Sequence, residues 1–372
     1  MILGLLPEIR GGLGTLAQTG QHTRFVDGYL RAYVRAFEEV RYFSYRQEAL
    51  ADFAPDPEVA ARVRIVPGSR CHPWLYAALM GLRHRRALGA CAVLRVFHLT
   101  GVLPALVTRR HAGVPFAVTY GFHYDRLARS RTRAWLHRRL ERLALAQADA
   151  VIVTTPELQA HVARRARSPE AVHLLPNAVD AAAFRPVERP PALVPTVLYV
   201  GRLAPEKNLQ TLVDALAKLR GRQDASLRFV GDGPLRAALA AEAERAGVRL
   251  ELSPVVDHAR LPQVYAAADV FVLPSLTEGH AKVLLEAMSC GLPCVASNVG
   301  GNRAVIVDGY TGLLVDPGDA GALADAIDRV LTDRALARRL GEAARREVVA
   351  RYDLRSALER EIELLRALGA RG

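Results

Sequence analysis

Lysine is scarce in this chain. Only three lysines (Lys207, Lys218 and Lys282) occur in 372 residues, although the formal net charge is +12, so arginine carries nearly all of the positive charge. An arginine-biased composition without functional meaning is one explanation, and attraction to anionic lipid or to an anionic small molecule is the other. The positive stretches contain no recognised nucleic-acid-binding module, which argues against a nucleic-acid partner.

Cysteine is also scarce, and its spacing argues against two structural devices. Four cysteines are too few for a disulfide framework in a chain of this length. Cys290 and Cys294 lie close together, but no second His or Cys pair nearby completes a zinc site. We therefore expect reduced, mostly buried thiols and a cytoplasmic setting.

Long apolar runs are absent as well. No run of about 18 apolar residues occurs, so the sequence predicts no membrane-spanning helix. Residues 1–12 lack a basic segment, and Pro7 and Glu8 interrupt their apolar run. We expect a first β-strand there rather than a signal peptide.

Short apolar runs alternate with helical segments along the whole chain. This pattern is typical of a parallel α/β fold, and the expected strands are residues 1–6, 40–45, 63–66, 92–98, 116–120, 151–154, 172–175, 196–200, 227–230, 250–252, 269–273, 294–296 and 313–315. The stretch RPVERPPALVP at 185–195 excludes regular structure by its prolines and predicts the domain linker. We expect two doubly wound domains, 1–185 and 186–352, and a C-terminal helix at 353–372.

The stretch from Pro274 to Asn298 carries the clearest sign of a site. Glu278 and Glu286 stand on either side of a helix start, in a strand–loop–helix–strand unit. The N-terminus of a helix offers unpaired N–H groups and the positive end of a dipole. Acids flanking such a point suit a ligand with hydroxyls at both ends and an anionic middle, which is the form of a nucleotide sugar.

Two cations lie near another strand end. Arg202 follows the strand at 196–200, and Lys207 precedes a helix for which Asn208 is the expected N-cap. Arginine binds phosphate oxygens through its fork of donors, and lysine acts as a point charge. The pair therefore suits a diphosphate.

The N-terminal half offers a glycine loop and two histidines. Residues 11–14 (GGLG) follow the first strand and lead into a helical stretch reaching to about Glu39; they either let a phosphate approach the backbone or only form a turn. His98 and His123 follow two other strands, at the sheet edge where ligands bind in parallel sheets. For each histidine, a packed or loop position is the alternative.

Residues 126–147 form a basic helical stretch. Leu136, Leu140 and Leu143 repeat at helical spacing, and arginines occupy the other face. Either this helix is solvated and packs on the sheet, or it lies on anionic lipid with Trp135 as an anchor.

These motifs together resemble glycosyltransferase family 4, the retaining glycosyl transferases group 1 with the GT-B fold. The resemblance rests on GGLG (11–14), LLPNAVDAAAF (174–184), VGRLAPEKNLQTLVDAL (200–216), FVGDGPLRAAL (229–239), LPSLTEGHAKVLLEAMSCGLPCVASNVGG (273–301) and DGYTGLLVDPGD (308–319). It implies two Rossmann-like domains facing across a cleft, an acceptor-binding one first and a nucleotide-sugar-binding one second. It also implies that the C-terminal helix packs back towards the N-terminal domain.

The resemblance implies a role for individual residues. Glu278 and His123 would be catalytic, Glu286 would hold the ribose hydroxyls, and Arg202 and Lys207 would bind the diphosphate. The other implied nucleotide-sugar contacts are Gly12, Gly231, Gly233, Val256, His280, Lys282 and Val283. No metal or other cofactor is expected.

The chain departs from the family pattern at several places, three of which bear on the expected site. Tyr120-Gly121 stands where His-Gly is usual, with His123 two residues later. Ala281 replaces a usual glycine or proline, and Pro254 stands near a usual glycine beside the base. The last departure leaves the choice of base open.

The expected function is retaining transfer of a sugar from a UDP- or GDP-linked donor to a glycan or lipid-linked acceptor, in glycolipid or surface-polysaccharide biosynthesis. The alternatives are a nucleotide-sugar epimerase or hydrolase of the same fold, and an inactive, membrane-associated module that binds sugar nucleotides. We expect a cytoplasmic enzyme, peripheral on the inner face of the cell membrane if residues 126–147 bind anionic lipid.

Overall fold

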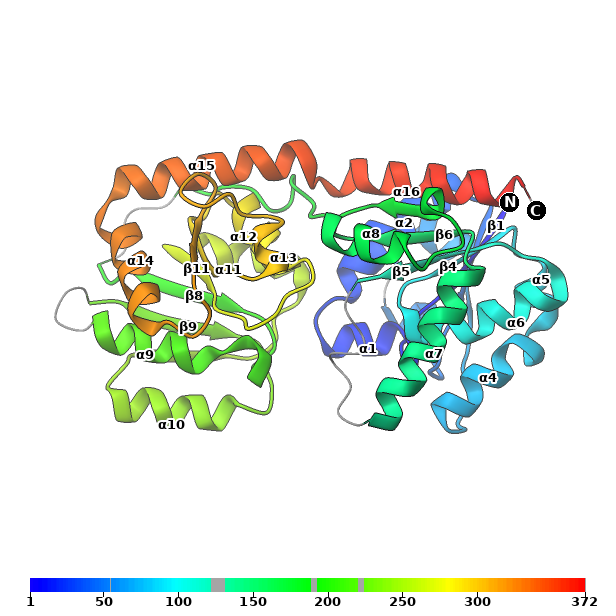
Figure 1. Ribbon diagram of the computed structural model, residues 1–372, viewed down its shortest axis with the longest axis horizontal. Helices are drawn as coiled ribbons and strands as arrows, with labels where there is room; N and C mark the ends of the chain where they lie inside the picture. Colours follow the sequence, from blue (N-terminus) through cyan, green and yellow to red (C-terminus); the bar gives the residue numbers. More distant parts are fainter. Residues whose placement is uncertain (54, 122–130, 189–192, 220–223, 372) are drawn as a thin grey trace. The chain divides into compact units, whose positions relative to one another are not determined.

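The computed structural model describes residues 1–53, 55–121, 131–188, 193–219 and 224–371. The chain folds into two compact units (Figure 1). Unit 1 comprises Met1–Pro176 and Ser356–Gly372, and unit 2 comprises Asn177–Arg355. Each unit is a parallel sheet with helices on both faces, so the predicted α/β class with two doubly wound domains is confirmed.

Unit 1 is built on a seven-stranded parallel sheet of order β3-β2-β1-β4-β5-β6-β7. The central strands of this sheet are almost entirely buried, as expected for parallel strands covered on both faces, and the two edge strands are only partly buried. The strands are β1 (Ile2–Leu6), β2 (Glu39–Phe43), β3 (Val63–Val66), β4 (Val93–Val96), β5 (Phe116–Tyr120), β6 (Ala150–Val153) and β7 (Val172–Leu174).

One prediction made for the helices of unit 1 is wrong. The expected continuous helix from residue 13 to about 39 is wrong, because α1 ends at Gln18 and Gly20 adopts a left-handed conformation (φ 69°). A π-helical segment (Arg24–Leu30) then leads into α2 (Arg31–Ala36). The other helices are α1 (Leu13–Gln18), α3 (Pro57–Arg62), α4 (Pro73–Arg83), α5 (Arg85–Gly89), α6 (Leu103–Ala112), α7 (Arg131–Gln147), α8 (Pro156–Ala163) and α16 (Leu354–Gly369), with 3₁₀ turns at Leu50–Phe53, Leu99–Val102 and Pro169–Ala171.

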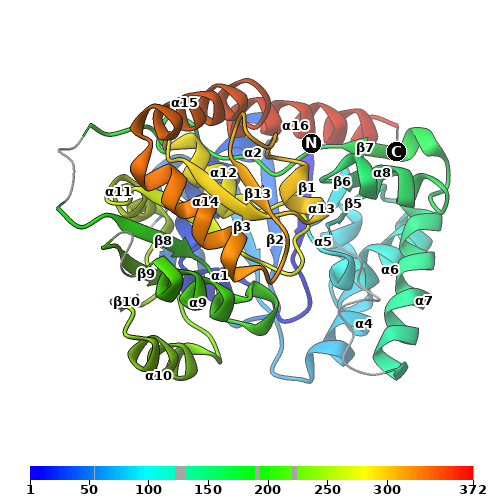
Figure 2. The same ribbon diagram turned by 60° about the vertical axis from the view of Figure 1, so that its left-hand side comes forward.

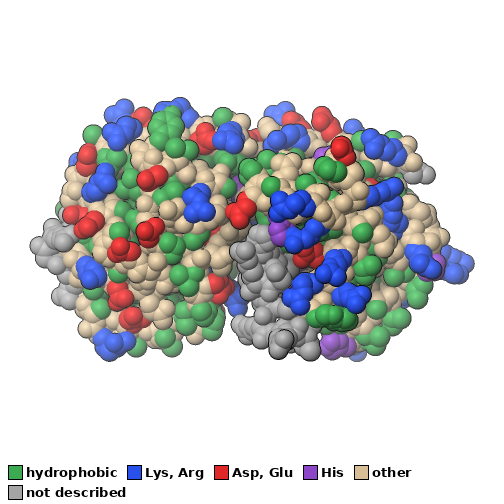
Figure 3. All heavy atoms as spheres, viewed as in Figure 1, with side chains coloured by type: hydrophobic (Ala, Val, Ile, Leu, Met, Phe, Trp, Pro, Cys, Tyr) green, Lys and Arg blue, Asp and Glu red, His purple; other side chains and the backbone are tan. Residues whose placement is uncertain are grey.

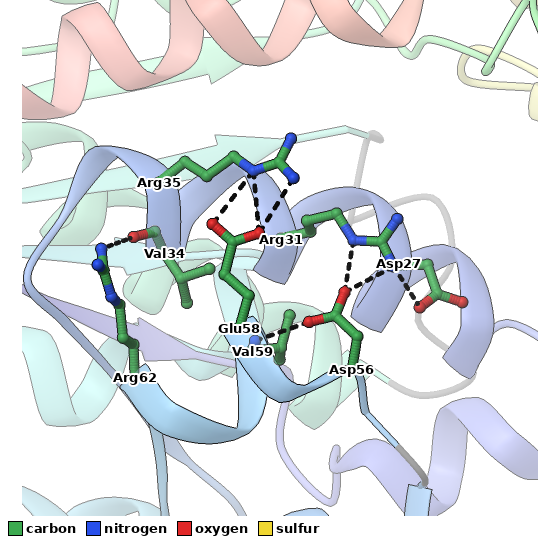
Figure 4. Close-up of polar contacts among 8 residues, drawn as sticks. All are labelled: Asp27, Arg31, Val34, Arg35, Asp56, Glu58, Val59 and Arg62. Carbon is green, nitrogen blue, oxygen red and sulfur yellow. Dashed lines mark hydrogen bonds and ion pairs between the residues drawn. The ribbon is translucent and has the colours of Figure 1, made fainter.

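Carboxylates fix α3 against α2. Asp56 caps α3 by accepting a hydrogen bond from the Val59 N–H (2.9 Å), and its other oxygen accepts one from Arg31 Nε (2.7 Å). Glu58 in the first turn pairs with Arg35 (3.0 Å) (Figure 4). Both acids of this turn are therefore neutralised by arginines of α2.

Unit 2 is built on a six-stranded parallel sheet of order β10-β9-β8-β11-β12-β13. Seen from the second direction in Figure 2, helices cover this sheet as well. The strands are β8 (Thr196–Val200), β9 (Ser226–Val230), β10 (Leu250–Ser253), β11 (Val270–Leu273), β12 (Cys294–Ser297) and β13 (Leu313–Val315). The helices are α9 (Leu209–Leu219), α10 (Arg236–Ala246), α11 (Leu261–Ala266), α12 (Lys282–Ser289), α13 (Gly300–Arg303), α14 (Ala320–Thr332) and α15 (Arg334–Arg351), with 3₁₀ turns at Pro205–Lys207 and His258–Arg260.

The structure places the division between the units at Pro176 and Asn177, whereas the sequence placed the linker at 185–195. Residues 177–184 join unit 2 through long-range contacts. The Val179 N–H donates to the Tyr352 carbonyl (2.9 Å), and Phe184 is buried in the core of unit 2. Neither contact has a local sequence signature.

The C-terminal helix α16 is fastened to unit 1 by a buried ion pair. Glu361 accepts hydrogen bonds from Arg95 Nε (2.6 Å) on β4 and from the Tyr33 hydroxyl (2.7 Å) on α2. All three residues are buried. Burial and the Glu361 carboxylate raise the pKa of Tyr33 well above its usual value, so the phenol stays a donor.

Among the helices of the described ranges, none combines the length and the apolar character that crossing a bilayer requires.

We predict that Glu361→Leu lowers the stability of unit 1 by about 3–5 kcal/mol, because it leaves the buried Arg95 charge without its acid. The control is Glu363→Leu on the exposed face of the same helix, which should change stability by less than about 0.5 kcal/mol. Denaturant unfolding can be followed by tryptophan fluorescence, since Trp74 and Trp135 both belong to unit 1. Equal unfolding midpoints for the two variants would show that this ion pair does not hold α16.

Candidate functional site

The site of unit 2 lies where its strand order reverses. From β8 the chain builds β9 and β10 on one side, and then returns to place β11 on the other side of β8. All neighbouring strands are parallel, so their carboxyl ends share one edge of the sheet. In open α/β sheets this switch point is where ligands bind. Arg202 and Lys207 follow β8, and Glu278 follows β11.

An ion pair joins the two loops at this point. Lys207 Nζ lies 2.6 Å from Glu278 Oε1, and the Ser275 hydroxyl donates to the same oxygen at 2.7 Å. The Leu276 N–H also donates to the Glu206 carbonyl (2.9 Å), so backbone and side chains both connect the loops. The structure thus brings together the predicted phosphate-binding lysine and the predicted catalytic acid.

Arg202 is the second cation of this edge. It is exposed, and its carbonyl accepts a hydrogen bond from the buried Tyr199 hydroxyl (2.9 Å), which fixes the backbone after β8. Asn208 is not the expected N-cap, because its backbone is left-handed (φ 53°). Its side chain instead accepts from the Thr211 hydroxyl (2.9 Å) and donates to the Pro274 carbonyl (3.3 Å). Asn208 therefore ties the start of α9 to the end of β11.

The turn predicted after β9 needs its glycines, because the backbone of a neighbouring loop lies too close for a Cβ atom. Gly231 has φ 144°, and a Cβ there would lie 2.0 Å from the Gly201 carbonyl oxygen. A Cβ on Gly233 would lie 2.3 Å from the Leu203 carbonyl oxygen. These glycines allow the loops after β8 and β9 to lie against each other beside Arg202.

Glu286 is held inside unit 2 by two aromatic side chains. It is only 2% exposed, the Tyr265 hydroxyl donates to its Oε2 (2.9 Å), and His258 Nε2 lies 3.2 Å from its Oε1. Burial and the nearby Glu286 raise the pKa of Tyr265 well above its usual value. A carboxylate oxygen can accept more than one hydrogen bond, so these two contacts do not by themselves prevent Glu286 from binding a ligand hydroxyl.

The N-terminus of α12 lies between the two glutamates, as the sequence predicts. Its N-cap residue, Ala281, provides no side-chain hydrogen bond to the first N–H groups of this helix. Lys282 is exposed and Val283 half-buried in the first turn, and Val256 is half-buried after β10.

His280 is a buried histidine just before this helix. It is 6% exposed, and its Nδ1 has no hydrogen-bond partner within the described parts of the chain. Burial, with a smaller effect of Lys282, lowers its pKa to about 4, so the ring is neutral at pH 7. Its carbonyl accepts from Asn177 Nδ2 (2.7 Å).

The glycine loop of unit 1 already binds a carboxylate of its own chain. Glu48 accepts hydrogen bonds from the Leu13 and Gly14 N–H groups (both 2.9 Å) and from the Ser44 hydroxyl (2.6 Å). A Cβ on Gly12 would lie 2.7 Å from Glu48 Oε1. Gly12 therefore permits close approach of an anionic group to the loop, and in the structure that group is Glu48.

The two predicted histidines of unit 1 differ in outcome. His123 lies outside the described residues. His98 caps a 3₁₀ turn, with its Nδ1 2.9 Å from the Thr100 hydroxyl and 3.3 Å from the Thr100 N–H. Burial and then His137 lower the pKa of His98 to about 4. This geometry gives His98 a structural role as a cap.

Four residues of these sites were not predicted. Ser275 lies two residues after β11 and could have been proposed from its position near a strand end. His258 and Tyr265 follow β10 but reach Glu286 only through tertiary packing, and Glu48 reaches the glycine loop in the same way. Within the described ranges, no three His, Cys, Asp or Glu side chains gather so as to hold a metal ion.

Comparison with known protein families matches both units. Residues 180–347 match the family described as glycosyl transferases group 1, and residues 20–178 match the glycosyl transferase 4-like domain.

Curated relatives cover the chain to different extents. The GDP-mannose-dependent alpha-mannosyltransferase of Mycolicibacterium smegmatis is 33% identical over 364 residues, which cover 88% of this chain and 90% of that protein. The sulfoquinovosyl transferase SQD2 of Arabidopsis thaliana is 32% identical over 273 residues, and the match spans 69% of this chain but about half (52%) of that protein. The alpha-D-kanosaminyltransferase of Streptomyces kanamyceticus is 34% identical over 62% of this chain and 63% of its own length.

Solved structures share the fold. The sucrose-phosphate synthase of Thermosynechococcus elongatus superposes with a TM-score of 0.81 at 26% identity and covers both chains completely. Anabaena HepE, solved in complex with UDP-glucose, has a TM-score of 0.79 at 19% identity over 98% of this chain and 99% of its own. The site at the β8–β11 switch point, the two family matches and the full-length mannosyltransferase relative lead to one conclusion: the chain belongs to the glycosyl transferases group 1, or glycosyltransferase family 4, and has the GT-B fold.

Proposed function

We propose that the protein is a retaining glycosyltransferase that moves a sugar from a nucleoside-diphosphate sugar to a glycan or lipid-linked acceptor. The Lys207–Glu278 ion pair carries this proposal, because it sets a phosphate-binding cation and an acid side by side at the switch point of the sheet. Family membership supplies the reaction class, since the named relatives are glycosyltransferases.

The donor's leaving group gathers negative charge as the glycosidic bond breaks. In the proposed mechanism Arg202, Lys207 and the first N–H groups of α12 stabilise that charge on the diphosphate. Lys207 has three N–H donors, so it can bind a phosphate oxygen while it keeps Glu278. Stabilisation by preorganised donors needs no bound metal ion.

The two acids take different parts in this proposal. Glu286, oriented by Tyr265 and His258, binds the ribose hydroxyls. Glu278 faces the transferred sugar and the positive charge that develops on its ring, with His123 as a second contact to sugar or acceptor. The acceptor attacks on the face from which the diphosphate departs, so no enzyme nucleophile is needed.

The remaining nucleotide-sugar contacts follow the same scheme. We assign the base to the region of Val256 and the Gly231–Gly233 turn, the β-phosphate to the backbone at Lys282 and Val283, and the sugar side to His280. Gly12 allows the loop that now holds Glu48 to accept a phosphate in its place.

The relatives indicate only the class of base and of sugar that the donor of this protein carries. Relatives from Mycolicibacterium smegmatis and Mycobacterium tuberculosis are named for GDP-mannose, and Anabaena HepE was solved with UDP-glucose. We propose a GDP- or UDP-linked hexose and a product in glycolipid or surface-polysaccharide synthesis. Donor consumption without an acceptor would instead favour an epimerase or hydrolase, and donor binding without turnover would favour an inactive binding module.

We predict that Lys207→Ala lowers turnover by at least about 100-fold, because it removes one preorganised charge from the leaving group. Lys218→Ala is the matched control, an exposed lysine on α9 away from the switch point. Initial rates of nucleoside-diphosphate release give the comparison, with circular dichroism as a check on folding. Near wild-type rates for a folded Lys207→Ala would contradict the assignment.

We also predict that exhaustive treatment with EDTA leaves turnover unchanged within about twofold, because Arg202, Lys207 and the α12 N–H groups provide the charge that a metal ion would otherwise supply. The same assay, repeated with added Mg²⁺ or Mn²⁺ after removal of the chelator, gives the comparison. Loss of activity on chelation and its recovery with either ion would contradict metal-independent transfer.

A further inference from the structure

Helix α4 of unit 1 has a second apolar face that points to solvent. Tyr76, Ala77 and Met80 are buried on its inner side. Leu75, Leu79 and Leu82 are 54%, 44% and 51% exposed. Their spacing of four and three residues places these leucines on one stripe of the helix. A stripe of exposed leucines costs solubility unless something covers it.

Helix α7 exposes apolar side chains too; α4 packs against α6, and α7 packs against the 3₁₀ turn Leu99–Val102 that leads into α6 (Figures 1 and 2). The three leucines that repeat along α7 differ in exposure: Leu140 is only 6% exposed, whereas Leu136 and Leu143 are 38% and 48% exposed. Trp135 is 55% exposed, and the Arg139 guanidinium lies 5.2 Å from the centre of its ring. We call Leu75, Leu79, Leu82, Trp135, Leu136 and Leu143 the apolar face.

The charged side chains that α4 and α7 expose within the described residues have one sign. No Asp or Glu occurs between Glu58 and Asp125, and Asp56 and Glu58 are already paired with arginines of α2 (Figure 4). On α7, Glu141 is only 8% exposed and thus turned away from solvent. The exposed charges on and beside the two helices are arginines: Arg70, Arg83, Arg85, Arg86, Arg138, Arg139 and Arg142.

The space-filling view shows the same combination on one side of unit 1. In Figure 3, blue arginine side chains gather with green apolar ones over the region where Figure 1 draws α7. Apolar side chains bordered by arginines match an anionic bilayer surface, where the former enter the acyl boundary and the latter bind headgroups. A tryptophan beside an arginine also suits the interface level of a bilayer.

We propose that α4 and α7 form a docking surface for an anionic lipid bilayer, with the α4 leucines as the inserting element and the α7 arginines as the headgroup contacts. The sequence pointed to the basic helix alone; the structure adds the leucine stripe of α4. This surface does not involve the donor site of unit 2. Vesicle binding and sugar transfer can therefore succeed or fail separately.

The test is flotation of the full chain with vesicles of phosphatidylcholine alone or with about one third phosphatidylglycerol, without any donor. The wild-type protein should float with the anionic vesicles and far less with the neutral ones. Binding should weaken as salt rises from about 0.05 to 0.5 M, since surface charge is screened.

Two variants separate the apolar and the charged contributions. Leu75→Ser/Leu79→Ser/Leu82→Ser should lose at least about tenfold in vesicle affinity, through lost insertion of the α4 stripe. Arg138→Gln/Arg139→Gln/Arg142→Gln should lose a similar amount and also lose most of the salt dependence. Each should keep its thermal stability and its donor turnover with a water-soluble acceptor.

Matched controls come from exposed positions of unit 2. Val307→Ser/Val349→Ser removes exposed apolar side chains, and Arg334→Gln/Arg339→Gln/Arg346→Gln removes exposed charge from α15. Both should bind vesicles like the wild type. The proposal is overturned if the wild type does not float, or if the α4 and α7 variants bind as well as the controls. A concentration-dependent dimer that the leucine variant abolishes, without flotation of the wild type, would assign the apolar face to self-association instead.

Discussion

The site of unit 2 depends on one ion pair, between Lys207 and Glu278, at the place where the strand order of the sheet reverses. It exists because the strand order reverses between β8 and β11, which brings the loops after two non-consecutive strands together at one sheet edge. Other contacts hold the two loops together. Ser275 donates a hydrogen bond to Glu278, Asn208 connects α9 to the end of β11, and glycine turns allow the neighbouring loops to lie against each other. A cation paired with an acid in a half-buried setting is also poised to exchange one hydrogen bond for a phosphate oxygen.

The positions of the strands could be predicted from the sequence because parallel strands covered on both faces are continuous apolar runs. The positions of the strands also allowed four site residues to be proposed, because each follows a strand or lies in the next helix: Glu278, Glu286, Arg202 and Lys207. The contacts that orient them could not. Tyr265 and His258 reach Glu286 through packing of α11 and a 3₁₀ turn against α12, and no local pattern indicates which carboxylate oxygen they meet.

Other parts of the structure show where local patterns fail. Gly20 ends α1 in a stretch that reads as one helix, and Asn208 adopts a left-handed backbone where an N-cap was expected. Leu136, Leu140 and Leu143 repeat at helical spacing on α7, yet only Leu140 is buried. Glu141 faces inward on that helix, which leaves its exposed charge wholly cationic. Both features follow from which side of the helix meets the unit, a choice that spacing alone does not determine.

The central claim is that the β8–β11 switch point binds a nucleoside-diphosphate sugar and releases its diphosphate to an acceptor. The most direct measurement is nucleoside-diphosphate release from a panel of UDP- and GDP-sugars, each assayed with and without a panel of glycan acceptors. The account predicts that one donor releases its nucleotide at a rate that rises with acceptor concentration, with the sugar recovered on the acceptor in the donor's anomeric configuration. Release that is independent of any acceptor, or a product of inverted configuration, would contradict it.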